Sequence, residues 1–155
     1  MERCFRSQKM ERNGKVKQYI LDTSVVIKWF SEFDEDDLDK ALNLRHEILT
    51  GKCSITVPDL LFYELLNALR YNIRFLSQDI KDALKSVIDM GFVVAGVEVH
   101  VMELAIEIAF KNNVTIYDSC FLALSQTEKM PLITSDYKFV DRMKGFENII
   151  RLHEL

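Results

Sequence analysis

Short apolar runs typical of β-strands alternate along this chain with longer amphipathic runs typical of α-helices. We expect strands at 19–21, 54–57, 92–95, 132–134 and 148–151, and helices at 25–30, 36–49, 59–74, 78–90, 97–111, 117–129 and 136–143. Strands separated by helices favour a parallel sheet with helices on both faces. We therefore predict an α/β fold with three layers, α/β/α, around a central parallel sheet.

A chain of 155 residues that is 48% hydrophobic has the length and the apolar material for one such domain. We assign residues 19–155 to it. Residues 1–18 contain six lysines or arginines and two glutamates, a net charge of +4, and show no periodic apolar face. We predict that this basic N-terminal extension is not needed for folding.

Several classes of protein are disfavoured by the sequence. The longest mostly apolar stretch, residues 92–110, is interrupted by Glu98, His100, Glu103 and Glu107, so no membrane span is expected. The first residues lack the apolar core of a secretory signal, and we expect a cytoplasmic protein. The three cysteines form no CxxC pair and the three histidines are isolated, which disfavours a zinc site.

The net charge of -4 argues against nucleic-acid binding through a simple basic surface. This argument is weaker for an enzyme whose carboxylates hold cations, because the bound metal then meets the phosphate. The charge of the chain therefore does not exclude RNA as a substrate.

Acidic residues follow two of the expected strands, at the sheet edge where ligands usually bind in parallel α/β folds. Asp22 and Asp136 come after strands, Asp118 opens the most apolar helix, and Glu64 lies in an amphipathic helix beside leucines. Each aspartate could instead cap a helix, and Glu64 could simply reach solvent. If the four carboxylates gather at one edge, their oxygen ligands favour Mg²⁺ or Mn²⁺ over zinc.

Four motifs occur in a distinctive order: LDTSVVIKWF, VPDLLFYELLNAL, IYDSCFLALSQ and LITSDYKF. In this order they resemble the motifs of PIN-domain ribonucleases, particularly the VapC toxins of type II toxin–antitoxin systems. The resemblance covers about residues 18–155. It implies endonucleolytic cleavage of RNA with Mg²⁺ or Mn²⁺, a cognate antitoxin partner, and a homodimer.

The resemblance also implies roles for individual residues. Asp22, Glu64, Asp118 and Asp136 match the catalytic, metal-binding acids of the family. Ser24 and Thr134 match small hydroxyl positions that orient these carboxylates, although either could be an ordinary cap or strand residue. Trp29 and Phe33 could line an antitoxin groove, or could simply be buried.

Two other functions remain open at this point. The first is a PIN nuclease of RNA maturation or decay that has no antitoxin. The second is a noncatalytic α/β signalling or interaction domain, such as a phosphoacceptor receiver. A receiver would carry paired acids after its first strand, whereas Asp22 stands alone there. The acid-rich residues 31–40 lack the ligand spacing of an EF-hand loop, and we expect a solvated start of a helix.

Overall fold

A computed structural model describes residues 15–30 and 35–155 of the chain. Within these ranges the elements follow one another as β1 (Lys17–Leu21), α1 (Thr23–Lys28), α2 (Leu38–Leu49), β2 (Cys53–Pro58), α3 (Leu60–Tyr71), α4 (Ser77–Ile88), β3 (Val93–Ala95), α5 (Val99–Asn112), α6 (Ile116–Glu128), β4 (Leu132–Thr134), α7 (Tyr137–Arg142), β5 (Ile149–Arg151) and the 3₁₀ turn η1 (Leu152–Glu154). The predicted order of strands and helices is confirmed.

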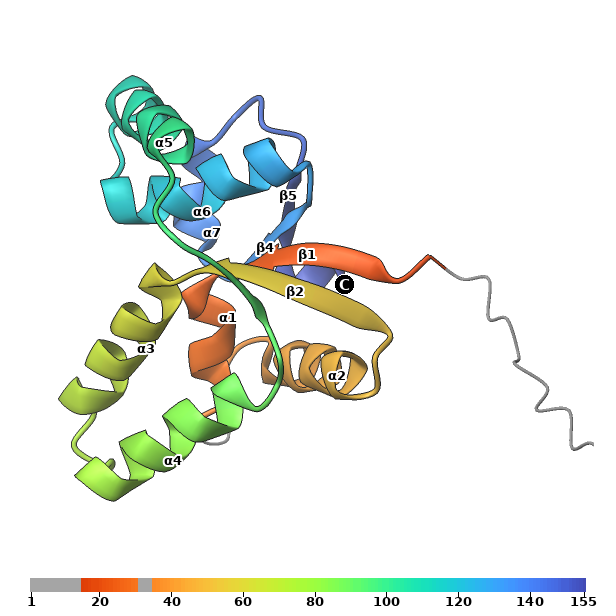
Figure 1. Cartoon of the computed structure of the whole chain (residues 1–155), viewed down its shortest axis with the longest axis vertical. Helices are drawn as coiled ribbons and strands as arrows, with labels where there is room; N and C mark the ends of the chain where they lie inside the picture. The colour runs from red at the N-terminus through yellow and green to blue at the C-terminus, as the bar shows by residue number, and fades with distance from the viewer. Residues whose placement is uncertain (1–14, 31–34) are drawn as a thin grey trace, which may run out of the picture.

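The five strands of the described ranges form one parallel sheet in the order β3-β2-β1-β4-β5. Helices α1 to α4 lie on one side of this sheet and helices α5 to α7 on the other (Figure 1). The predicted α/β/α arrangement is therefore confirmed. The chain runs from β1 outward to β3 and then returns to place β4 on the other side of β1, so the topological switch falls between β1 and β4.

The central strands are apolar because both of their faces are covered. Ile20 and Leu21 of β1 and all three residues of β4 are buried. At the edge of the sheet, Val93 and Val94 of β3 are exposed. The ends of β1 and β4 are thus held within the core, which gives the residues that follow them a rigid base.

Helix α6 crosses this central part of the sheet, with contacts to β1, β2 and β4, and also packs against α5. Every residue from Ser119 to Ser125 is buried. The hydroxyl groups of the two buried serines donate hydrogen bonds to backbone carbonyls. Ser119 Oγ donates to the Thr115 carbonyl at 2.8 Å, and Ser125 Oγ donates to the Met130 carbonyl at 2.6 Å. Packing of α6 on the sheet fixes the position of Asp118 in its first turn.

Two details concern the segments near the first helix. Strand β1 begins at Lys17, where Lys17 pairs with Cys53, so the sheet extends two residues into the segment assigned to the extension. Trp29 is buried, with its indole Nε1 donating to the Ala41 carbonyl at 2.8 Å.

Residues 1–14, Phe33 and the part of the acidic run at 31–34 lie outside the described residues. Helix α2, which follows that run, starts at Leu38.

None of the helices in the described ranges combines the length and the apolar character that crossing a membrane requires.

Candidate active site

The four predicted acids extend from elements that meet at the switch between β1 and β4. Asp22 directly follows β1, and Asp136 comes two residues after β4. Glu64 lies in the second turn of α3, and Asp118 is the third residue of α6. A crevice at the carboxyl ends of strands beside such a switch is the usual ligand site of parallel α/β sheets.

Asp22 occupies the N-cap position of α1, but its carboxylate makes no capping hydrogen bond. Instead, Asp22 Oδ2 accepts hydrogen bonds from Ser24 Oγ at 2.5 Å and from Thr134 Oγ1 at 2.8 Å. Helix capping therefore does not explain this carboxylate, which two hydroxyl groups hold in one orientation.

The same two hydroxyls connect the ends of β1 and β4. Ser24 Oγ lies 3.3 Å from Thr134 Oγ1 and accepts a hydrogen bond from the Ser135 backbone N–H at 3.0 Å. Thr134 Oγ1 accepts one from the Asp136 backbone N–H, also at 3.0 Å. The network positions Asp22 and the backbone of Asp136 relative to each other.

Glu64 is half-buried, and its carboxylate faces α1 rather than extending freely into solvent. Its Oε2 accepts a 2.5 Å hydrogen bond from Oγ1 of Thr23, a side chain that is itself buried. Sequence analysis missed Thr23, because its partner lies 41 positions away and no local pattern connects them. This bond brings Glu64 to the start of α1, next to Asp22.

The capping alternatives for the other two acids have different outcomes. Thr115, not Asp118, caps α6: Thr115 Oγ1 accepts from the Asp118 backbone N–H at 3.0 Å and donates to Asp118 Oδ2 at 2.8 Å. Asp136 does cap α7, since its Oδ1 accepts from the Phe139 backbone N–H at 3.0 Å. Asp136 thus combines a capping role with an exposed position beside the other acids.

Three of the four carboxylates line one pocket, and the fourth, Glu64, is hydrogen-bonded to the residue after Asp22. Burial raises the pKa of Asp22, and the negative charges of Asp118 and Asp136 raise it further, against the lowering effect of the two hydroxyl bonds. Burial also raises the pKa of Glu64, with added contributions from Asp22 and Asp118. Asp22, Asp118 and Asp136 line one small pocket. We call Asp22, Glu64, Asp118 and Asp136 the acid cluster.

The donor chemistry of the acid cluster fits a hard divalent cation. Within residues 15–30 and 35–155, no lysine, arginine or histidine forms an ion pair with any of the four acids. Carboxylate oxygens with no protein cation nearby are the ligands that Mg²⁺ and Mn²⁺ prefer. Across the same part of the chain, however, no group of three or more acids, histidines or cysteines is arranged as a metal site. The carboxylate oxygens of the acid cluster lie near one another but do not form a complete coordination shell.

Comparisons with known proteins agree with this architecture. The PIN domain family model matches residues 19–144. A search of curated protein sequences found no match. By structure, the chain is similar to a toxin–antitoxin complex from Klebsiella pneumoniae, at a TM-score of 0.65 and 14% identity, over 88% of this chain and 99% of that one.

Two further solved structures share the fold. One is PAE2754 from Pyrobaculum aerophilum, with a TM-score of 0.62 and 19% identity over 89% of this chain and 91% of that one. The other is VapC20 from Mycobacterium tuberculosis, described as a Sarcin-Ricin loop cleaving toxin, with a TM-score of 0.63 and 15% identity over 84% and 97%. At such identities the likeness concerns the fold.

Proposed function

This chain belongs to the PIN-domain family, and from that premise we propose that it is a metal-dependent endoribonuclease, the toxin of a VapC-type toxin–antitoxin pair. The observation that carries the proposal is the acid cluster: carboxylates that follow β1 and β4 and that extend from α3 and α6 lie near one another, and none of them forms an ion pair with a lysine, arginine or histidine of residues 15–30 and 35–155. Gathering like charges in this way is unfavourable unless a cation binds among them.

In the proposed reaction, Asp22, Glu64, Asp118 and Asp136 would hold Mg²⁺ or Mn²⁺. The bound metal would lower the pKa of an attacking water and neutralise charge on the phosphate. The side chains around the metal position its ligands. Ser24 and Thr134 hold the carboxylate of Asp22, and no side-chain nucleophile is required.

Two other hydroxyls orient acids of the cluster from neighbouring positions. Thr23 donates to Glu64, and Thr115 donates to Asp118. The hydrogen bond from Thr23 lowers the pKa of Glu64, against the raising effect of burial, and so favours the charged form that binds a cation. The two threonines therefore hold Glu64 and Asp118 in defined orientations before a metal ion binds.

The structural neighbours support the proposal of a protein partner. One of them is a toxin–antitoxin complex, and another is described as a toxin that cleaves the Sarcin-Ricin loop. By extension, we propose that an antitoxin binds and neutralises this chain and that RNA is its substrate. We also propose that the chain forms a homodimer and acts in the cytoplasm.

The proposed activity can be tested by incubating the full chain with a mixed pool of RNA in Mg²⁺, in Mn²⁺ and in EDTA. We expect internal cleavage that requires the metal. Asp22→Asn should lower the rate of cleavage by at least about 100-fold. This effect is larger than the one expected when a residue that only supports a metal ligand is replaced. Asp89→Asn is the matched control, because Asp89 is exposed at the end of α4, and it should cleave normally. Cleavage that persists in EDTA, or no cleavage of any RNA in the pool, would contradict the proposal.

A further inference from the structure

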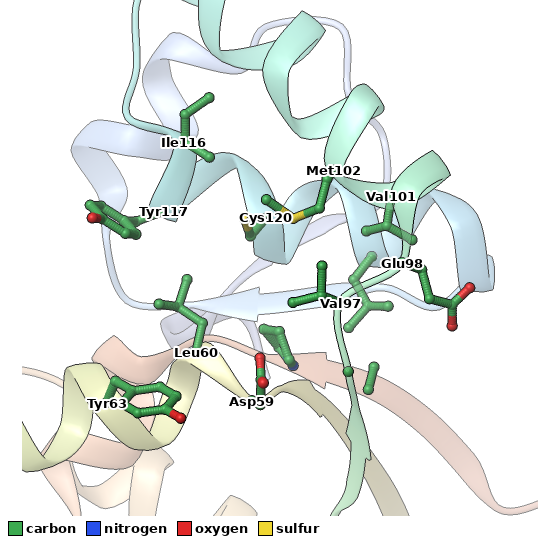
Figure 2. Close-up of a pocket in the computed structure, with 14 residues that line it drawn as sticks. Asp59, Leu60, Tyr63, Val97, Glu98, Val101, Met102, Ile116, Tyr117 and Cys120 are labelled. Carbon is green, nitrogen blue, oxygen red and sulfur yellow. Dashed lines mark hydrogen bonds between the residues drawn. The ribbon is translucent and has the colours of Figure 1, made fainter.

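An apolar pocket of about 280 Å³ lies between the first turn of α3, the segment that joins β3 to α5, and the first turn of α6 (Figure 2). Leu60, Val97, Met102 and Ile116 form part of its wall. Enclosed apolar walls with a few polar groups are the usual surroundings of a bound aromatic ring. The acid cluster uses the same two helices, α3 and α6.

Two exposed tyrosines line the pocket, and each is next to an acid of the cluster in the sequence. Tyr63 precedes Glu64 and is 70% exposed, while Tyr117 precedes Asp118 and is 63% exposed. Figure 2 shows them at the same end of the pocket, Tyr63 from α3 and Tyr117 from α6. Exposed aromatic rings beside a phosphate-binding site are the groups on which single-stranded nucleic acids stack their bases.

The pocket and the acid cluster are also close in space. Cys120 lines the pocket. It lies on α6 two residues after Asp118, and Leu60 of the pocket wall lies on α3 four residues before Glu64. The pocket wall and the cluster are therefore within about one helical turn of each other on each of these two helices.

Asp59 places a carboxylate in the lining of the pocket. It stands at the N-cap position of α3, yet its side chain makes no capping bond. Its backbone N–H donates to the Ala95 carbonyl at 3.1 Å, and across the described part of the chain its carboxylate has no hydrogen bond or ion pair. In Figure 2 this carboxylate lies among the lining residues, next to Leu60 and Val97. Because Asp59 is partly exposed and lines the pocket, its two carboxylate oxygens can accept hydrogen bonds from a ligand that carries donors.

We propose that this pocket binds one base of the RNA substrate, with a preference for guanine, by stacking on Tyr63 and Tyr117 and hydrogen bonding to Asp59. The inference rests on the proposed ribonuclease function. Guanine presents a ring N–H and an amino group side by side, two donors that match the two oxygens of a carboxylate. Adenine and cytosine present one amino group on the same edge, and hypoxanthine has the ring N–H without the amino group.

Base binding can be measured without catalysis, on the full-length protein in EDTA, by following backbone amide signals in ¹⁵N NMR titrations. The ligands are GMP, IMP and ribose 5-phosphate. We expect GMP to shift the signals of Gly96, Val97 and Met102, and IMP to bind about 10-fold more weakly because one carboxylate oxygen loses its donor. Ribose 5-phosphate should leave these signals in place.

Three variants assign the contacts. Tyr117→Ala should weaken GMP binding on the order of 10-fold, the effect of losing one stacking partner. Tyr71→Ala is the matched control, since Tyr71 is 79% exposed at the other end of α3 and does not line the pocket. It should bind GMP normally. Asp59→Asn should remove the difference between GMP and IMP.

Three results would overturn the proposal: no shift with GMP, equal shifts with ribose 5-phosphate, or equal binding of GMP and IMP by the wild type. A fourth would be a change from dimer to monomer in sedimentation of Tyr117→Ala with unchanged GMP affinity, because the pocket would then be part of an interface between two copies. RNA cleavage without GMP binding would refute the base pocket and leave the ribonuclease intact. GMP binding without RNA cleavage would support the pocket and refute the ribonuclease.

Discussion

Asp22 stands where an aspartate ordinarily caps a helix, and two hydroxyl groups bind its carboxylate instead. The sequence allows both roles, because a residue between a strand and a helix is a good position for a cap and for a ligand. The hydrogen-bond partners of its carboxylate oxygens distinguish the two roles. In the folded chain Asp22 is half-buried and lies next to other acids, so its charged carboxylate is less favourable there than a neutral side chain of the same shape would be.

This arrangement gives the metal-free protein a defined dependence on pH. Burial raises the pKa of Asp22 and of Glu64 above their values in the unfolded chain, and Asp118 and Asp136 face Asp22 as further negative charges. The folded state then binds protons more tightly than the unfolded state does. The stabilisation from these two groups is therefore complete below the unfolded pKa and is lost as pH rises through the folded pKa.

We predict that Asp22→Asn gains melting temperature relative to wild type as pH is raised from about 4.5 to 8 in EDTA, because the variant lacks one of the two groups. Thermal unfolding of both proteins at several pH values measures this difference. Asp89→Asn serves as the control and should follow the wild type. A difference that stays constant, or that changes in the opposite direction, would show that Asp22 has no raised pKa in the folded chain.

Thr134 is a second residue whose role can be tested on its own. Thr134→Val keeps the buried shape but removes the donor to Asp22 and the acceptor for the Asp136 backbone N–H. We expect cleavage to fall about 10- to 100-fold, and the free energy of unfolding to fall by about 1–3 kcal/mol. Kinetics of RNA cleavage and denaturant unfolding measure the two effects.

Thr134→Ser retains the hydroxyl and is the control for Thr134→Val. If the hydroxyl positions Asp22, the serine variant should recover most of the cleavage. Equal cleavage by the valine variant and wild type would remove Thr134 from the support of the site.

At the scale of the elements, the strands and helices were predictable because their apolar periodicity is strong. All three residues of strand β4 are buried, two of them apolar, and α6 has buried residues around its whole circumference, as expected for elements covered on several sides. Parallel pairing followed from the alternation of strands with helices. The strand order could not be predicted from the apolar periodicity or from the alternation of strands and helices. These patterns do not indicate on which side of β1 the later strands pair.

The acid cluster was predictable to the extent that it depends on strand ends. Asp22 and Asp136 were indicated by their positions after β1 and β4, and Asp118 and Glu64 chiefly by the family motif. The hydrogen bond between Thr23 and Glu64 and the pocket beside Tyr117 depend on how helices pack, which no local sequence pattern encodes.

At the scale of the whole molecule, the sheet begins at Lys17, close to the boundary between the basic and acidic parts of the sequence. We propose that the domain folds without residues 1–14, because the sequence of this segment shows no periodic apolar face. A truncated chain starting at Lys15 should keep the free energy of unfolding within about 0.5 kcal/mol of the full chain.

A second truncation, starting at Tyr19, is the comparison. It removes Lys17 and Gln18, which pair with Cys53 and Ser54 in the sheet, and should melt at a lower temperature. Thermal unfolding of the three chains measures both effects. A chain starting at Lys15 that does not fold would contradict the proposed domain boundary.

We propose that the acid cluster binds metal for RNA cleavage and does not stabilise the fold. Asp118→Asn tests it most directly, because Asn keeps the shape and can still accept the hydrogen bond from Thr115. The measurement is paired: melting temperature in EDTA, and Mg²⁺-dependent cleavage of a mixed RNA pool, for wild type, Asp118→Asn and the control Asp89→Asn. We predict that Asp118→Asn melts at the same or a higher temperature, since one repelling charge is removed, and that its cleavage is lost. Unchanged cleavage, or loss of folding in parallel with loss of cleavage, would contradict the claim.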